Sequence, residues 1–153
     1  MRRISARFWA PLIALGVALS GPASAQPRCA PTRADMEGPF YKPDAARREA
    51  TGRGLRVGGV VRSAGSCAPI GQARVEWWQA NPQGDYDDAH RGTLLSGADG
   101  AYRFETDFPP PYSGRPSHVH LKVFAQGYRT LTTQIYPQTG QREIAFDLVI
   151  VKE

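Results

Sequence analysis

The sequence predicts an all-β protein, an antiparallel β-sandwich with long loops that carry the candidate site. Short segments with alternating bulky apolar and polar residues recur along the chain, and glycine, aspartate or proline bounds each of them. No segment after residue 25 shows the 3.6-residue apolar period of an amphipathic helix. With 153 residues the chain is long enough for one domain with its own core.

Residues 1–25 have the pattern of a secretory signal peptide: a basic start, an apolar run over 8–19 and a small-residue cleavage site at Ala23-Ser24-Ala25. The apolar run is too short to span a bilayer comfortably. We therefore expect export to the periplasm or the exterior, with no membrane span after cleavage. This segment holds three of the 19 basic residues and none of the 14 acidic ones, so without it the formal net charge falls from +5 to +2. Beyond Arg47-Arg48 no basic run remains to support nucleic-acid binding.

The chain after the leader has two cysteines, Cys29 and Cys67. An even number in an exported chain predicts one disulfide. Closing a loop of this length stabilises a fold by about 4 kcal/mol in the chain-entropy model. The bond would fix an N-terminal arm, residues 26–54, to a turn between two strands. Two buried free thiols are the alternative. A cysteine-ligated metal is not expected, because the chain has no Cys-x-x-Cys pair.

The elements follow in order along the chain. The arm is rich in proline, arginine and aspartate without a sustained period, so we expect it to be extended, with one helical turn near 45–50. Its apolar island, Glu37-Gly-Pro-Phe-Tyr41, is expected to pack against the body of the domain. The remaining chain, 55–153, is the predicted sandwich core, and segment 80–96 is expected to be a long polar loop. Strands are predicted at 55–61, 73–79, 102–104, 117–125, 128–135 and 144–151.

Two histidines lie on the strand predicted at 117–125. Because His118 and His120 are two residues apart, both imidazoles face the same side of a strand, while Val119, Leu121 and Val123 face the core. A His-x-His pair alone also fits ordinary exposed strand residues. A strand that buries one face and presents two histidines on the other is nevertheless suited to hold a metal.

Two tyrosines complete the candidate site. Tyr112 lies six residues before His118, behind a proline-rich turn, and Tyr86 lies in the polar loop. Taken singly, the first fits an aromatic lid and the second a surface residue. Together the four side chains fall within 35 residues, from Tyr86 to His120. Phenolates favour a hard trivalent ion, and neutral imidazole suits iron. The joint pattern predicts a mononuclear Fe(III) site.

Six motifs, in the same order and over nearly the whole chain after the leader, resemble those of the intradiol ring-cleavage dioxygenases, which include the catechol, hydroxyquinol and protocatechuate dioxygenases. They are Glu37-Gly-Pro-Phe-Tyr41, Val75-Glu-Trp-Trp-Gln-Ala-Asn81, Asp99-Gly-Ala-Tyr-Arg-Phe104, Pro111-Tyr112, Arg115-Pro-Ser-His-Val-His120 and Thr133-Gln-Ile-Tyr136. The resemblance implies a β-sandwich that holds one non-haem Fe(III) through two tyrosines and two histidines. By motif these ligands are Tyr86, Tyr112, His118 and His120.

The resemblance also implies a reaction. A catechol-type aromatic would be cleaved by O2 between its two hydroxylated carbons to give a cis,cis-muconate-type diacid. Tyr112 would leave the metal and accept a substrate proton. Arg115 and Gln134 match positions beside the substrate, and Arg115 would stabilise negative charge that develops there. The turn after Tyr112 is cut to Ser113-Gly114 and the region after Tyr136 is brief, which predicts a shallow, open pocket.

Two other functions remain open on the sequence alone. Val57-Gly-Gly-Val-Val61, Pro69-Ile-Gly71 and Asp99-Gly-Ala-Tyr102 also fit non-catalytic transthyretin-like or carboxypeptidase-regulatory β-sandwiches, which leave the tyrosines and histidines unexplained. A zinc or copper site could instead use His90 with His118 and His120. Replacing His90 by alanine would abolish metal binding at the second kind of site and leave the iron site intact.

Overall fold

A computed structural model of the chain describes residues 29–153, so the expected signal peptide at 1–25 lies outside the described residues. The described part consists of strands joined by turns and loops, and its assigned elements include no helix. The strands are β1 (Leu55–Ser63), β2 (Arg74–Trp78), β3 (Arg91–Leu95), β4 (Ala101–Thr106), β5 (Val119–Phe124), β6 (Leu131–Ile135), β7 (Glu143–Ala145) and β8 (Leu148–Ile150). Over residues 29–153, nothing helical is long and apolar enough to cross a bilayer.

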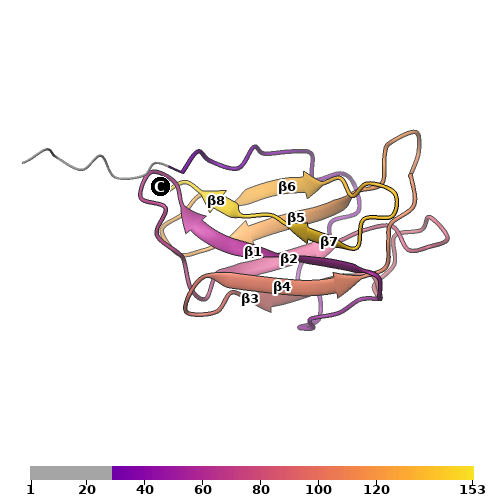
Figure 1. Cartoon of the computed structure of the whole chain (residues 1–153), viewed down its shortest axis with the longest axis horizontal. Helices are drawn as coiled ribbons and strands as arrows, with labels where there is room; N and C mark the ends of the chain where they lie inside the picture. The colour runs from indigo at the N-terminus through magenta and orange to yellow at the C-terminus, as the bar shows by residue number, and fades with distance from the viewer. Residues whose placement is uncertain (1–28) are drawn as a thin grey trace, which may run out of the picture.

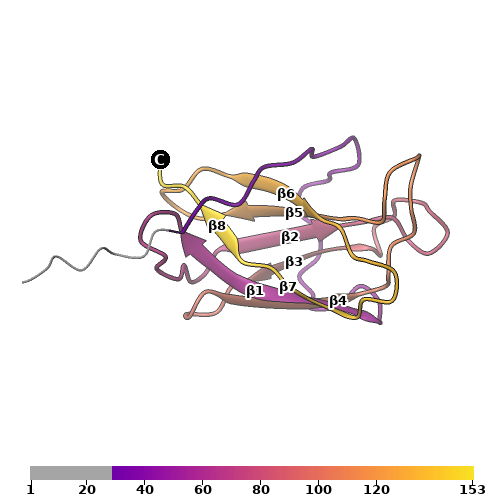
Figure 2. The same ribbon diagram turned by 45° about the horizontal axis from the view of Figure 1, so that its top comes forward.

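The strands form two four-stranded sheets, which lie as two layers in Figures 1 and 2. One sheet has the order β4-β1-β7, with β8 also pairing with β1, and the other has the order β3-β2-β5-β6. All pairings between these strands are antiparallel except those of β1 with β7 and β8. The prediction of an all-β antiparallel sandwich is confirmed, and the β1–β7 and β1–β8 pairs are its parallel exceptions.

The core lies between the two sheets, and strand alternation fills it. Val119, Leu121 and Val123 of β5 are fully buried, as their spacing predicts. Trp77 of β2 stacks on Phe104 of β4, with ring centroids 4.4 Å apart, so one aromatic pair links the sheets. Tyr102 is also buried, and its hydroxyl donates a hydrogen bond to the Phe146 carbonyl. These contacts fix which face of each strand points outward.

The prediction of an unbroken polar loop over 80–96 is wrong, because strand β3 occupies its second half. Arg91 and Thr93 look like loop residues in the sequence, yet both are buried. The arm covers them: Arg91 donates to the Phe40 carbonyl, and the Thr93 hydroxyl donates to the Ala45 carbonyl. Cover from a distant segment therefore makes a strand where local polarity indicates a loop.

The strand expected at 144–151 divides into β7 and β8. The break falls at Phe146 and Asp147, where the Asp147 carboxylate accepts hydrogen bonds from the Val60 amide and the Arg62 guanidinium. Gly59 permits this approach, since a Cβ there would lie 2.1 Å from the Phe146 carbonyl oxygen. The chain thus bends beside β1, and β7 and β8 pair with different parts of that strand.

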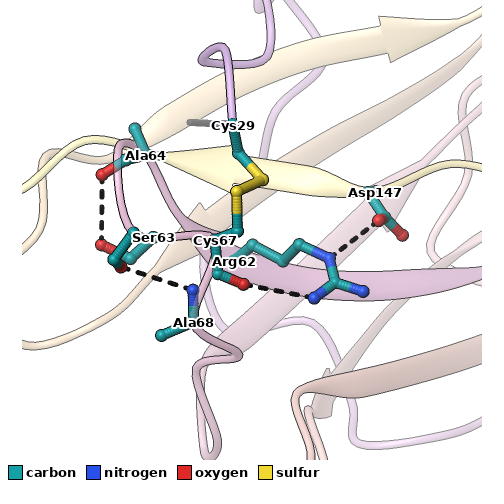
Figure 3. Close-up of a disulfide and its surroundings, with 8 residues drawn as sticks. Cys29, Arg62, Ser63, Ala64, Cys67, Ala68 and Asp147 are labelled. Atoms are coloured by element: carbon teal, nitrogen blue, oxygen red, sulfur yellow. Dashed lines mark hydrogen bonds and ion pairs between the residues drawn. A yellow bond between two sulfur atoms is a disulfide. The ribbon is translucent and has the colours of Figure 1, made fainter. Parts of the chain in front are cut away.

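The arm is extended and wraps the second sheet. A disulfide between Cys29 and Cys67 joins its start to the turn after β1, where Arg62 donates to the Cys67 carbonyl (Figure 3). From the disulfide the arm runs beside β6 (Figure 1), where the Asp35 amide donates to the Thr132 carbonyl. The helical turn expected near 45–50 does not form. Arg47 and Ala50 instead form bridges to Thr93 and Glu105, one on each sheet.

Candidate metal centre

One row of side chains crosses the outer face of the β3-β2-β5-β6 sheet. Trp78 pairs in register with both Arg91 and His120, and His120 pairs with Gln134. All four residues are buried, although they face away from the sandwich core. The arm covers this face, and Tyr41 from its apolar island packs on Trp78 with ring centroids 5.1 Å apart. The centre of the row is therefore a shielded polar site.

Three of the predicted ligands converge on one point. The Tyr86 hydroxyl lies 3.1 Å from Nε2 of His118 and 3.3 Å from Nε2 of His120. The Tyr112 ring packs edge-on against the Tyr86 ring, with centroids 5.3 Å apart. The structure therefore brings together all four residues that the sequence singles out.

The His118 ring is oriented by the chain just before it. Its Nδ1 lies 2.7 Å from the Pro116 carbonyl oxygen, so Nδ1 donates and carries the proton. The Nε2 lone pair then points at the Tyr86 hydroxyl, as in a histidine ready to ligate a metal. Trp78 stacks on His120 with nearly parallel rings, whose centroids are 4.8 Å apart. This contact restricts the orientation of the His120 imidazole.

Tyr86 is held by a loop that is stiffened by its own side chains. The Asn81 amide oxygen accepts from two backbone amides of the loop, and its nitrogen donates to Asp87. The two ring nitrogens of His90 face Asp87 at 2.8 Å and Asp107 at 3.1 Å. Phe40 of the arm stacks on the Tyr86 ring at 4.3 Å. The phenol is thus fixed from the loop side and from the arm side.

Tyr112 and Arg115 are the two ends of a tight hairpin. Each donates its amide to the other's carbonyl, at 3.1 and 2.8 Å. The two residues between them, Ser113 and Gly114, have φ of 47° and 76°, and two successive positive values are typical of a type I′ turn. The short Ser-Gly connection therefore places Arg115 directly beside Tyr112.

The Arg115 guanidinium links the histidines to a polar network. One of its nitrogens lies 3.5 Å from Nε2 of His118, and another donates to the Gln134 side-chain oxygen at 2.6 Å. The Tyr136 hydroxyl donates to an Asp35 carboxylate oxygen at 2.8 Å and lies 3.0 Å from the same Gln134 oxygen. Gln134 and Arg115 thus lie next to the candidate ligands, and the arm holds the far end of the network.

Burial sets the charge of the ligand groups. It lowers the pKa of His118, and it lowers the pKa of His120 to about 3, aided by the neighbouring His118 and Arg115. Burial raises the pKa of Tyr86 to about 12, against the opposing effect of Arg115. At neutral pH both imidazoles are therefore neutral and the phenol keeps its proton. Only a strongly polarising cation would bring Tyr86 to its phenolate form.

Three contributors to the site were not singled out in the sequence: Trp78, Phe40 and Tyr136. Adjacent Trp77 and Trp78 must face opposite sides of one strand, which signals that the outer face is also covered. Tyr136 follows Gln134 by two residues, the same spacing as the histidines. Both patterns are visible in the sequence, but the sequence does not show which segment covers the outer face.

The structure does not bring His90 to the other two histidines. Both of its ring nitrogens face carboxylates, and over residues 29–153 no three His, Cys, Asp or Glu side chains cluster as a metal site. The zinc or copper alternative that uses His90 therefore has no support in the geometry. His90 instead braces the Tyr86 loop.

Known proteins resemble this chain in both sequence and fold. A family model described as "Dioxygenase" matches residues 32–152. A chlorocatechol 1,2-dioxygenase from Cupriavidus pinatubonensis is 31% identical over 139 residues, covering 69% of this chain and 54% of the relative. A hydroxyquinol 1,2-dioxygenase from Nocardioides simplex is 34% identical over 138 residues, covering 69% of this chain and 47% of the relative. The chain thus spans about half the length of these curated relatives.

A solved structure of similar size matches as well. It is the dioxygenase domain of a dioxygenase and carbohydrate-binding protein fusion from Streptomyces sp. SirexAA-E. Its TM-score is 0.73 at 32% sequence identity, and the match covers 81% of this chain and 100% of that domain. The catechol 1,2-dioxygenase of Acinetobacter radioresistens aligns with a TM-score of 0.69 at 25% identity, over 82% of this chain and 64% of that chain.

Proposed function

The chain belongs to the intradiol ring-cleavage dioxygenase family, and from that premise we propose that it cleaves catechol-type aromatics. The ring would open between the two hydroxylated carbons, O2 would be consumed, and the product would be a cis,cis-muconate-type diacid. The observation that carries the proposal is the convergence of the Tyr86 hydroxyl on Nε2 of both His118 and His120. A non-catalytic β-sandwich module has no use for these buried groups on a covered outer face.

One non-haem Fe(III) per chain is the proposed cofactor, with Tyr86, Tyr112, His118 and His120 as its ligands. The donor set fits this ion, because two neutral imidazoles and two phenols supply nitrogen and hard oxygen ligands. Two phenolates would lower the net charge of the centre and favour the ferric over the ferrous state. Bound Fe(III) supplies Lewis-acid character, which favours the deprotonated catechol and its reaction with O2.

Arg115 is the proposed stabiliser of negative charge on the bound substrate. Its guanidinium lies beside Nε2 of His118, and Gln134 holds it by a 2.6 Å hydrogen bond. A fixed cation that points at the place where charge develops needs no reorganisation during the reaction. Gln134 in turn donates to the Met36 carbonyl, so the arm fixes the position of Arg115.

Tyr112 is the proposed acceptor of a substrate proton. It stands at one end of the Ser113-Gly114 hairpin, and Phe40 meets its ring edge-on at 5.7 Å, whereas Tyr86 is held by its loop and by the 4.3 Å Phe40 stack. Tyr112 would therefore be the ligand that leaves the metal, as the family resemblance implies. Released as a phenolate, it would accept a proton from a catechol hydroxyl.

Isotopically labelled O2 provides the direct test. Iron-loaded protein is mixed with catechol, and the product is identified by mass spectrometry and ultraviolet absorption. We expect a diacid that contains both labelled oxygen atoms. A product cleaved outside the two hydroxylated carbons, or unchanged catechol with stoichiometric iron bound, would overturn the proposal. The iron-free protein is the matched control.

Export to the periplasm or the exterior is proposed for the same chain. The Cys29–Cys67 disulfide supports it, because such bonds persist in oxidising compartments. Expression of the full chain with a C-terminal tag, followed by fractionation and N-terminal sequencing, is the test. Retention of the leader on a cytoplasmic product with reduced cysteines would contradict the proposal.

A further inference from the structure

A groove of about 490 Å³ lies beside the candidate metal centre. Residues 32–35 of the arm form one wall, Thr133, Gln134 and Tyr136 at the end of β6 form the floor, and Phe146 lies at the β7–β8 corner. We call it the arm groove. Its volume is within the range of sites that hold small organic ligands.

The arm wall is fixed to the sandwich by hydrogen bonds at three levels. The Thr32 hydroxyl accepts from the Val149 amide, and the Thr32 amide donates to the Val149 carbonyl. The Arg33 carbonyl accepts from the Thr133 hydroxyl at 2.8 Å, and the Asp35 amide donates to Thr132. The groove is therefore a built feature of the fold.

The groove joins the candidate metal centre through two residues. Gln134 and Tyr136 line it, and both also belong to the network that holds Arg115. The Tyr136 ring lies 6.2 Å from the His118 ring, centroid to centroid. Tyr136 thus lies both in the groove lining and near His118, so a ligand whose reactive ring lies at the histidines would pass this ring to reach the groove.

The lining indicates what kind of extension fits. Tyr136 is 43% exposed and Phe146 is partly buried, so aromatic surface is available on two sides. Arg33 is exposed, and no carboxylate within the described residues forms an ion pair with it. Its guanidinium can lie over an aromatic ring.

Charge argues against a charged extension. A hydrogen bond from the Met36 amide, together with the Tyr136 hydroxyl and nearby arginines, holds the pKa of Asp35 below its usual value, so its carboxylate is ionised. Arg33 and Asp35 therefore contribute one positive and one negative charge to the same wall. Neither an anionic nor a cationic substituent gains a clear advantage there. A neutral aromatic ring can lie under the Arg33 guanidinium, and a hydroxyl on that ring can donate to the Asp35 carboxylate.

We propose that the arm groove binds the second aromatic ring of two-ring catechols, in which a neutral aryl group is attached to the catechol ring. This inference rests on the proposed function, since the catechol ring must lie at the metal centre. It makes aryl-substituted catechols, rather than simple ones, the preferred substrate class. Arg33 and the exposed ring of Tyr136 would contact the second ring.

The test compares the affinities of three probes for iron-loaded protein under nitrogen, by isothermal titration calorimetry. The probes are 4-methylcatechol, 4-phenylcatechol and 4-cyclohexylcatechol. We expect 4-phenylcatechol to bind about tenfold more tightly than 4-methylcatechol, the gain typical of a stacked ring with a cation above it. Equal affinities of the methyl and phenyl probes would overturn the inference. Equal affinities of the phenyl and cyclohexyl probes would overturn its aromatic part.

Two variants locate the effect in the groove. Arg33→Ala removes the cation, and Ala34→Leu fills the groove from an exposed arm position. Both are expected to reduce the ratio of the phenyl and methyl affinities toward one, whereas Arg103→Ala, on the exposed face of β4, is expected to keep the wild-type ratio. An unchanged ratio in both groove variants would contradict the assignment. If no probe binds at all, the proposed function itself fails, and this outcome is distinct from a lost ratio.

Discussion

The outer faces of the two sheets differ, although their inner faces have the same apolar chemistry. On the β4-β1-β7 sheet the outward side chains Arg56, Ala101 and Arg103 are exposed. On the β3-β2-β5-β6 sheet the outward side chains Trp78 and His120 are each only 2% exposed. The difference comes from the arm, which crosses the second face only.

Covering polar groups is costly, and this cost identifies the functional face. A buried polar group without a partner lowers stability by about 1–3 kcal/mol. Among residues 29–153 the Trp78 indole nitrogen is buried without a hydrogen-bond partner, and two histidines are buried in their neutral form. Within residues 29–153, no buried side-chain nitrogen or oxygen without a partner lies on β1, β4, β7 or β8. Buried polar groups that lower stability are expected where shielding from water serves a functional site.

The largest expected effect comes from replacing His120 by alanine. His120 lies on the covered face and its Nε2 points at the Tyr86 hydroxyl, so its loss should abolish stoichiometric iron binding and ring cleavage together. Iron content by mass spectrometry and O2 uptake with catechol measure both. A variant that keeps one iron per chain and full turnover would remove His120 from the ligand set.

Leu121→Ala, one residue further along β5, is the matched control for that variant. Its side chain faces the core and is fully buried, so its removal should lower the free energy of unfolding by about 2–5 kcal/mol. Iron binding should persist at temperatures where the variant is folded. The His120 and Leu121 variants would then show that one face of β5 serves iron binding and the other serves stability.

A smaller effect is expected for Arg115→Ala. Without a preorganised cation beside the substrate, kcat should fall about a hundredfold while iron remains bound. Steady-state kinetics with catechol, corrected for iron content, is the measurement. Arg103→Ala on the exposed face should have no effect on kcat. Full turnover in the Arg115 variant with iron bound would exclude the electrostatic role.

The disulfide tests whether the arm maintains the difference between the two faces. Replacing Cys29 and Cys67 together by serine should lower the free energy of unfolding by about 4 kcal/mol in the chain-entropy model, for a separation of 38 residues. Urea unfolding gives the value. Hydrogen exchange should show faster exchange at Asp35 and Arg48, whose amides bond to the second sheet. Unchanged exchange at both amides would show that the arm stays docked without the disulfide.

The smallest effect concerns acid stability of the loop that holds Tyr86. Burial alone would raise the pKa of Asp87, but hydrogen bonds from Asn81 and His90 lower it to about 2 from the usual 3.8. A depressed carboxyl pKa stabilises the fold above its unfolded-state pKa, and this stabilisation is lost as the pH falls from about 4 toward 2.

Asp87→Asn should therefore remove part of the stability loss in that pH window, as measured by urea unfolding from pH 5 to pH 2. Asp44→Asn is the control, because Asp44 lies exposed on the arm. Equal pH dependence in the wild type and the Asp87 variant would contradict the assignment.

Much of this organisation follows from local patterns in the sequence. The alternation around Val119 and Leu121 predicts which face is the core, and the two-residue spacing of His118 and His120 predicts that they share the other face. Both expectations hold because a strand's period is set by backbone geometry alone. The structure also brings Tyr86 to the histidines and packs Tyr112 against the Tyr86 ring, as joint occurrence and motif order predicted.

The remainder depends on contacts between distant segments. Strand β3 was missed because Arg91 and Thr93 are polar, and only the arm residues near 40–46 make them buried. The break between β7 and β8 depends on a close approach of Gly59 to the Phe146 carbonyl. The roles of Trp78 and Phe40 likewise require knowing that the arm crosses this sheet. Local periodicity carries no information about such cover.

The central claim is that the covered face holds Fe(III) through two tyrosines and two histidines, and a visible absorption spectrum tests it most directly. Residues 26–153, purified and loaded with Fe(III), should show a broad tyrosinate-to-iron charge-transfer band that shifts when catechol is added under nitrogen. Tyr86→Phe should alter the band and Tyr136→Phe should leave it in place. A colourless protein that takes up no stoichiometric iron would contradict the account.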